Sequence, residues 1–268
     1  MNKRLKASEM FRSRNLIVSL AKNDFKTRFA GSYFGIMWAF VNPIVTVLLY
    51  WFVFGFVFTG ARGNGEYPYV IYLVSGLVPW FLFQEALTMG TNSMLDYSYL
   101  VKKVVFKIEV LPVVKILAST FVHFFFLIFS ISLFAVMGYF PGIYVVQLVY
   151  YLICLWVFTL ALVYCTSAVV LFFRDLGQII NIFMQVFMWM VPILWNESQF
   201  EAFPVVLYIL KLNPMYYIVT GYRDALIDGR WFFERPVITL YFWGIVLVLY
   251  AAGSKIFKVL RPHFADVL

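Results

Sequence analysis

The feature that most constrains this chain is a run of 58 positions, residues 116–173, without Asp, Glu, Lys or Arg. Soluble domains carry roughly 25% charged residues, so such a run is not expected in one. A transmembrane helix needs about 20 apolar residues to cross roughly 30 Å of hydrocarbon. The run is too long for one crossing, and the Gly and Pro residues at 138–142 interrupt it. It therefore predicts two spans, at about 112–137 and 144–172.

Four further apolar segments complete a six-span pattern. Residues 34–61 contain no charge, and the whole chain is 63% hydrophobic but only 13% charged, too little to cover a water-facing surface. These further spans are predicted at about 34–58, 69–92, 176–195 and 236–255. We therefore expect an all-α integral membrane protein with six transmembrane helices, and a single transmembrane domain over residues 1–268.

Residues 196–235 differ from the spans. Their apolar stretch 202–210 is too short to cross a bilayer, and Asn213-Pro214 separates it from a second stretch at 215–227. We predict two short re-entrant helices, because irregular backbone at membrane depth must be buried in protein or line a cavity. The alternative is a surface loop with one interfacial helix.

Residues 12–29 predict an amphipathic helix. Apolar residues recur every fourth position on one face, and cations lie off that face. The apolar positions are Ile17, Ala21, Phe25 and Phe29, and the cations are Lys22, Lys26 and Arg28. This pattern favours a helix lying in the membrane interface near anionic headgroups. The alternative is an ordinary basic anchor before the first span.

The distribution of Lys and Arg predicts the orientation. Six spans place both termini on one side, and that side then carries 16 of the 21 Lys and Arg residues. The positive-inside rule makes it the cytoplasmic side. Because the charges sit in short segments between apolar runs, the net charge of +8 indicates membrane orientation and not nucleic-acid binding.

The basic loop after the second span predicts a short helix with one apolar face. Tyr97, Leu100, Val101 and Val104 follow the i, i+3, i+4, i+7 pattern. An exposed apolar face on a cytoplasmic helix favours docking in a groove of a partner. The alternative is a loop that packs on the chain's own spans.

Two polar stripes are expected within the membrane. One lies on the second span at Glu85, Thr88, Asn92 and Asp96, and the other on the fifth at Gln178, Asn181 and Gln185. Polar groups in a span face the bundle interior or a wet path, which makes these residues candidates for lining a transport path. The alternative is hydrogen bonding between helices, worth about 0.6 kcal/mol per contact.

Signals for an enzyme or a metal site are absent from the sequence. It contains no G-x-x-x-x-G-K-[ST] loop to hold ATP phosphates. His123 and His263 have no metal-ligand spacing with the two cysteines. We expect no catalytic residues, no metal and no cofactor in this chain.

Several short motifs, in order, resemble those of a known family. They run from Ser32-Tyr33-Phe34-Gly35-Ile36-Met37-Trp38 with Asn42-Pro43, through Tyr50-Trp51-Phe52-Val53-Phe54-Gly55, Leu100-Val101-Lys102-Lys103-Val104 before Leu111-Pro112, Phe173-Arg174-Asp175 and Pro192-Ile193-Leu194-Trp195, to Leu212-Asn213-Pro214-Met215-Tyr216-Tyr217, Gly221-Tyr222-Arg223-Asp224 and Phe264-Ala265-Asp266. The chain resembles an ABC-2 type permease of the polysaccharide export group, which exports wall teichoic acid, O-antigen and capsule. It looks closest to teichoic acid translocation permeases. It departs from the family's usual Phe-Pro-Arg at Phe106-Lys107-Ile108 and from Ser-Pro-Ile at Val191-Pro192-Ile193.

The resemblance implies a bacterial plasma-membrane homodimer with two copies of a separate ABC ATPase, which would bind ATP and Mg²⁺. It implies a polymer carried on undecaprenyl diphosphate, moved outward through a channel between the two permeases. It implies re-entrant helices at the outer mouth, with Asn213, Pro214, Tyr216, Tyr217, Arg223 and Asp224. It also implies that residues 97–105 are the coupling helix, through Tyr97, Tyr99, Leu100, Val101, Lys102, Lys103 and Val104.

The interfacial cations are then candidates for recruiting the lipid diphosphate. Lys22, Lys26 and Arg28 precede the first span at headgroup depth, where each cation attracts anionic groups by about 1 kcal/mol. Two other functions stay open: a membrane enzyme acting on polyprenyl-linked sugars, and an ABC-2 exporter of a drug or another small molecule.

Overall fold

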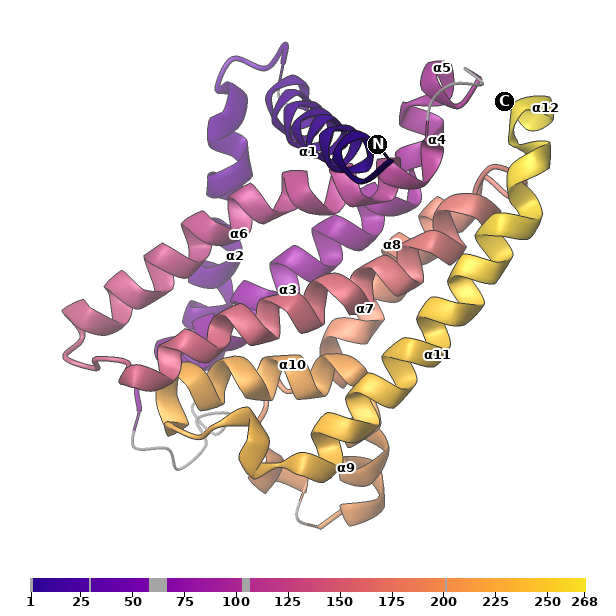
Figure 1. The fold of residues 1–268 in the computed structure, drawn as a ribbon. Helices are drawn as coiled ribbons and strands as arrows, with labels where there is room; N and C mark the ends of the chain where they lie inside the picture. Colours follow the sequence, from indigo (N-terminus) through magenta and orange to yellow (C-terminus); the bar gives the residue numbers. More distant parts are fainter. Residues whose placement is uncertain (1, 29, 58–66, 103–106, 201) are drawn as a thin grey trace.

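Helices form every regular element in the described part of the chain (Figure 1). The computed structural model describes the backbone of residues 2–28, 30–57, 67–102, 107–200 and 202–268, and side chains from residue 14 onward. The longer helices are α1 (Asn2–Thr27), α2 (Trp38–Phe52), α3 (Tyr69–Thr91), α6 (Leu111–Val136), α7 (Leu148–Val169), α8 (Leu176–Phe187), α9 (Pro204–Lys211), α10 (Pro214–Arg223) and α11 (Pro236–Leu260). The single-turn helices are α4 (Ser93–Asp96), α5 (Ser98–Val101) and α12 (Phe264–Val267). The predicted all-α class is confirmed.

Five helical segments of the described chain are long and apolar enough to cross a membrane. They are Gly35–Val57, Tyr69–Thr91, Ile108–Val136, Ile143–Val169 and Pro236–Val267. They correspond to the first, second, third, fourth and sixth predicted spans, so the protein is an integral membrane protein.

The predicted span 176–195 is a shorter apolar helix that ends at Met190. Its 12-residue α-helix continues as a three-residue 3₁₀ turn, about 22 Å in all at 1.5 Å per residue. The helix stops there because Pro192 disfavours helical backbone in the residue before it. Val191 has an extended backbone, with φ −111° and ψ 140°. A sixth crossing stays a prediction.

The core is a bundle in which α3 is the most buried long helix. It packs against α6 and α7, α11 packs on the outer side of α7, and α2 and α8 also contact α3. The rings of Phe83 and Phe158 stack with centroids 5.3 Å apart. Gly253 of α11 packs so closely on α7 that an added Cβ would lie 2.5 Å from the Ala161 carbonyl oxygen. Small residues allow such close approach of helices in membranes.

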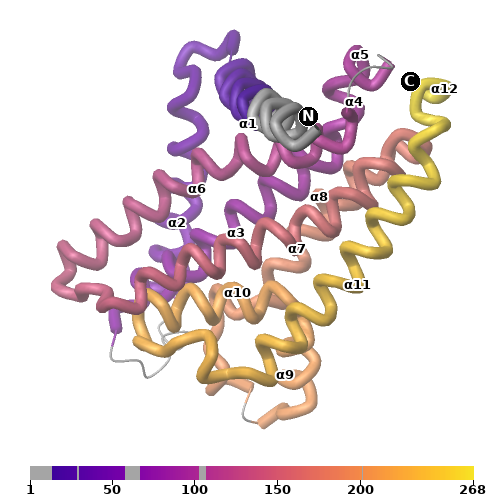
Figure 2. The backbone as a smooth tube through the Cα atoms, viewed as in Figure 1, coloured from indigo at the N-terminus to yellow at the C-terminus, as the bar shows by residue number. Residues whose placement is uncertain are grey.

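Helix α1 lies across the end of this bundle (Figure 2). Its predicted apolar face packs on α6, with Ala21 buried and the Phe25 and Phe121 rings 5.9 Å apart. The helix begins earlier than the predicted residue 12, and Phe29 lies outside the described residues. The chain turns into α2 through Gly31 and Gly35, whose φ angles of +92° and +51° suit glycine.

The two termini lie at the same end of the bundle, beside α5, and we call this the α1 end (Figure 1). The opposite end, the α9 end, holds α9 and α10. These two short helices occupy the segment predicted to be re-entrant. Helix α10 packs on α3, α7 and α11, whereas α9 is largely exposed.

Candidate coupling site and transport surface

The segment predicted to dock on a partner consists of two single turns, α4 and α5, joined at Tyr97. Tyr97 and Val101 are buried, and Leu100 is half-buried. They pack in a cluster with Met94, Ile108, Leu111, Ala168, Leu171, Phe257 and Phe264. The face predicted to be apolar and open thus packs on the chain's own helices, because α6 and the C-terminal end of α11 cover it.

The surface that this segment leaves open consists of other side chains. Tyr99 is 57% exposed, and Lys102 is also exposed. Lys103 and Val104 lie outside the described residues. Among the described residues of this segment, the side chains available to a partner are therefore Tyr99, Lys102 and Asp96, with part of Leu100.

A cluster of charged and polar side chains joins this segment to α1 and α6. The Lys115 Nζ atom lies 2.6 Å from Asp24 Oδ1 and 2.8 Å from Asp96 Oδ2. The Tyr97 hydroxyl donates a hydrogen bond of 2.7 Å to the same Asp24 oxygen. Lys115 is only 4% exposed and Asp24 9%. Burial, followed by the hydrogen bond to Asp24, raises the pKa of Tyr97, which keeps it a neutral donor.

The predicted polar stripe of α3 is bonded to neighbouring elements. Glu85 pairs with Arg28, which directly follows α1. The Thr88 hydroxyl lies 3.4 Å from the Asn181 amide oxygen of α8, and the Asn92 amide donates to the Thr88 carbonyl at 3.1 Å. The contacts of Glu85 and Thr88 fit the alternative of bonding between elements, and that of Thr88 places α3 and α8 side by side. The contact of Asn92 is local to the C-terminal end of α3.

The stripe on α8 is open. Gln178, Asn181 and Gln185 are all exposed, and Gln178 and Gln185 have no side-chain hydrogen bond within the described residues. Apolar side chains of the same helix, among them Ile182 and Val186, are exposed as well. Lipid cannot satisfy an exposed amide, so this face is suited to contact with water or protein.

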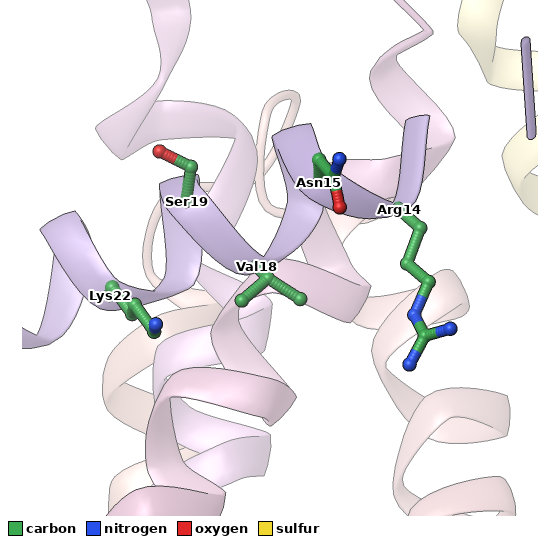
Figure 3. A pocket seen from close by; sticks show the side chains of 5 residues that line it. All are labelled: Arg14, Asn15, Val18, Ser19 and Lys22. Carbon is green, nitrogen blue, oxygen red and sulfur yellow. The ribbon is translucent and has the colours of Figure 1, made fainter. Parts of the chain in front are cut away.

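A pocket of about 470 Å³ lies along α1 and has two cations at its ends (Figure 3). It is lined by Arg14, Asn15, Val18, Ser19 and Lys22. Arg14 and Lys22 are two helical turns apart, about 12 Å along the axis. Of the three cations predicted at the interface, Lys22 and Lys26 are exposed, whereas Arg28 pairs with Glu85.

The predicted outer-mouth residues start and end α10. The Asn213 side chain accepts a hydrogen bond from the Met215 N–H at 2.9 Å, and Pro214 occupies the first turn, a favourable helix start. Tyr216 donates to Glu197. The Tyr217 hydroxyl lies 3.0 Å from that of Tyr150.

At the other end of α10, Asp224 receives a hydrogen bond from Arg235 at 3.2 Å. The neighbouring Arg223 is buried under Tyr72. Both contacts tie α10 to elements distant in the sequence, so this end of the helix is fixed in place.

The non-helical residues 193–195 beside α10 have their carbonyl groups satisfied by side chains. Arg223 donates to the Ile193 carbonyl at 3.3 Å. The hydroxyl groups of Tyr69 and Tyr72 donate to Leu194 and Trp195, at 3.3 and 2.7 Å. Irregular backbone is therefore stabilised by three side chains of α3 and α10.

Comparison with known proteins identifies the family. Residues 15–227 match the ABC-2 type transporter family. This chain belongs to the ABC-2 type transporter family. The match covers most of the chain, from α1 through α10, and favours a transporter over the membrane-enzyme alternative.

Curated relatives are similar to this ABC-2 transporter over nearly its full length. The O-antigen export system permease protein RfbA of Myxococcus xanthus is 29% identical, covering 96% of this chain and 97% of its own. Two proteins of the same name from Klebsiella pneumoniae are 29% and 28% identical, each covering 95% of both chains. These three relatives are O-antigen permeases, so the closer likeness to teichoic acid permeases stays a prediction.

Sequence reasoning missed two residues of this ABC-2 transporter, Asp24 and Lys115. Each carried a signal. Asp24 is an acid three positions after Ala21, next to the apolar face of a basic helix, and Lys115 is a lone cation at the start of a predicted span. Charges in such places need partners. That the two are partners depends on how α1 crosses α6, which the sequence does not specify.

Proposed function

We propose that this chain is the membrane subunit of an ATP-driven exporter of lipid-linked polysaccharide, with an O-antigen type polymer as its cargo. The observation that carries the proposal is its similarity to three O-antigen export permeases over nearly the whole length of each chain. A small-molecule exporter is the second candidate, and it has no such relative among the three.

The exposed polar stripe of α8 supports a path formed between two copies of the chain. Gln178, Asn181 and Gln185 face outward from the single subunit. A second copy facing this surface would exclude lipid from the stripe and allow a hydrophilic passage there. We therefore assign α8, with Thr88 beside it on α3, to the lining of the path in a homodimer.

The α1 end is assigned to the cytoplasm, with a separate ABC ATPase beneath it. The excess of Lys and Arg in the segments predicted to be cytoplasmic supports this orientation. The α4–α5 segment would dock on the ATPase through Tyr99 and Lys102, two of the side chains that its own fold leaves exposed.

The diphosphate of an undecaprenyl-diphosphate carrier would be recruited along α1. Lys22 and Lys26 are exposed, and the pocket between Arg14 and Lys22 offers cations at both ends. Arg28 already pairs with Glu85, so its charge would contribute less. Substitution of Lys22 and Lys26 by Gln should leave insertion intact and reduce export.

The proposal is tested with the chain co-expressed with the ATPase from its own gene neighbourhood and reconstituted in proteoliposomes. Undecaprenyl-diphosphate-linked O-antigen should stimulate ATP hydrolysis, and the permease alone should hydrolyse none. Teichoic acid and capsule precursors serve as comparison cargoes. Stimulation by small amphiphilic drugs but by no lipid-linked polymer would decide for the second candidate.

Docking is tested separately with Tyr99→Ala combined with Lys102→Glu. ATPase co-purification should fall, whereas Lys258→Glu, an exposed cation near the same end, should keep it. Equal co-purification of both variants would contradict the assignment of the α4–α5 segment.

A further inference from the structure

The cluster of Asp24, Asp96, Tyr97 and Lys115, which we call the Asp24–Lys115 cluster, joins three elements through one buried cation. Asp24 belongs to α1, Lys115 to α6, and Asp96 and Tyr97 to the α4–α5 segment. Lys115 contacts both carboxylates, and Tyr97 donates to the same Asp24 oxygen that Lys115 contacts. Lys115 Nζ also lies 5.0 Å from the centroid of the Tyr97 ring.

Apolar contacts also attach α1 to the bundle, beside this cluster. The apolar face of α1 packs on α6 through Ala21 and through the contact of Phe25 with Phe121. A buried ion pair adds little net stability, because desolvation of the two charges offsets their attraction. What the cluster adds is a directional link between α1 and the α4–α5 segment, since hydrogen bonds weaken steeply when their geometry changes.

We propose that the Asp24–Lys115 cluster transmits movement of the α4–α5 segment to α1, with Lys115 as the positioning residue at its centre. A shift of the segment displaces Asp96 and the Tyr97 hydroxyl, and Lys115 and Asp24 follow. The exposed cations Lys22 and Lys26 of α1 then move with the state of the ATPase. This inference rests on the proposed function, because it takes the segment as the ATPase contact.

The test measures hydrogen exchange by mass spectrometry in the full permease–ATPase complex in nanodiscs, with and without ATP and vanadate. In the wild-type complex, peptides covering residues 93–101 and residues 14–27 of α1 should both change protection. In the double variant Lys115→Met with Asp24→Asn, residues 93–101 should still respond and α1 should not. Polymer exported per ATP hydrolysed should fall about fivefold or more, in the usual range of energetic coupling.

The matched control is Glu109→Gln with Arg261→Gln. This exposed ion pair joins the start of the third span to the C-terminal end of α11, and no residue of α1 takes part in it. Its removal should leave both hydrogen-exchange responses and the polymer exported per ATP unchanged.

If the first double variant fails to accumulate, Tyr97→Phe serves in its place. It removes only the hydrogen bond to Asp24 and should weaken the α1 response.

Three outcomes overturn the inference. In the first, α1 of the variant responds to ATP as in the wild type. In the second, α1 loses protection equally in both nucleotide states while export per ATP is unchanged, which assigns the cluster a structural role only. In the third, residues 93–101 of the wild type do not respond, which also contradicts docking of this segment on the ATPase but leaves export itself to the proteoliposome assay.

Discussion

The guanidinium carbon of Arg223 lies 3.5 Å from the centroid of the Tyr72 ring. Arg223 is 6% exposed, and no carboxylate lies within ion-pair distance of it in the described chain. Its charge is instead balanced by the ring and by the carbonyl groups of Ile193 and Tyr72. One side chain thus joins α10, α3 and the non-helical residues after α8.

Substitution of Arg223 by Lys should destabilise the protein. A Lys ammonium cannot both stack flat on the ring and direct two donors at separate carbonyl groups. The loss should be about 2 kcal/mol, since a desolvated cation–π contact is worth roughly that amount. Thermal unfolding in nanodiscs measures it. Arg230→Lys, at an exposed site nearby, is the control, and equal melting temperatures for the two variants would contradict the role.

Substitution of Gly253 by Ala should separate α11 from α7. The new Cβ would lie 2.5 Å from the Ala161 carbonyl oxygen, so backbone must shift. Overpacking of this kind costs about 1–3 kcal/mol. Gly244→Ala in the same helix is the control, because no atom lies within 4 Å of its added Cβ. A lowered melting temperature is expected for Gly253→Ala only.

The stability contributed by Asp224 should depend on pH. Burial raises the pKa of Asp224 to about 6, with Arg235 opposing the shift and Asp228, Arg230 and Glu234 as the further charges nearby. Because the folded-state pKa lies above the unfolded value of about 3.9, this group's contribution is fully present below that value. It is lost as pH rises through about 6.

Asp224→Asn, neutral at every pH, reports this contribution directly. The melting temperature of the Asn variant relative to wild type should increase between pH 5 and 7.5. Asp228→Asn, at an exposed position, is the control. A difference that does not change with pH would show that Asp224 keeps its ordinary titration.

The spans could be predicted from the sequence because hydrocarbon thickness and charge exclusion act locally. Four predicted spans agree with helical segments to within a few residues, and the span predicted at 236–255 begins at the predicted residue but continues to Val267. Tyr97 and Val101 of the predicted apolar face point inward instead, because they pack in a cluster with Phe257 and Phe264, which are distant in the sequence. Periodicity identifies an apolar face, but it does not specify which surface that face contacts.

The candidate site was predictable only in part, for the same reason. The stripe at Thr88 and Asn92 was found from spacing, whereas the pairing of Glu85 with Arg28 and of Lys115 with Asp24 depends on how α1 crosses the bundle. Two glycines with positive φ, Gly31 and Gly35, shape the turn that joins α1 to α2. Their backbone angles cannot be read from the residue type alone, because glycine occupies both signs of φ readily.

The stripe on α8 gives a prediction that separates a transport path from a lipid-facing surface. Substitution of Gln178 and Gln185 by Leu removes two exposed amides that have no bonding partner in the described chain. If lipid faced them, the change would favour the folded subunit and leave export intact. If they line a hydrophilic path, export should fall while insertion and ATPase co-purification persist, because a polar polymer loses hydrogen-bonding partners.

The control for this pair changes apolar side chains of the same helix. Ile182→Leu with Val186→Leu alters two exposed positions between and beside the amides without changing polarity. Export by this control should match the wild type in the proteoliposome assay. Normal export by the Gln178→Leu, Gln185→Leu variant would move the path away from α8, whereas loss of export in both variants would show that packing of this helix, and not its polarity, governs transport.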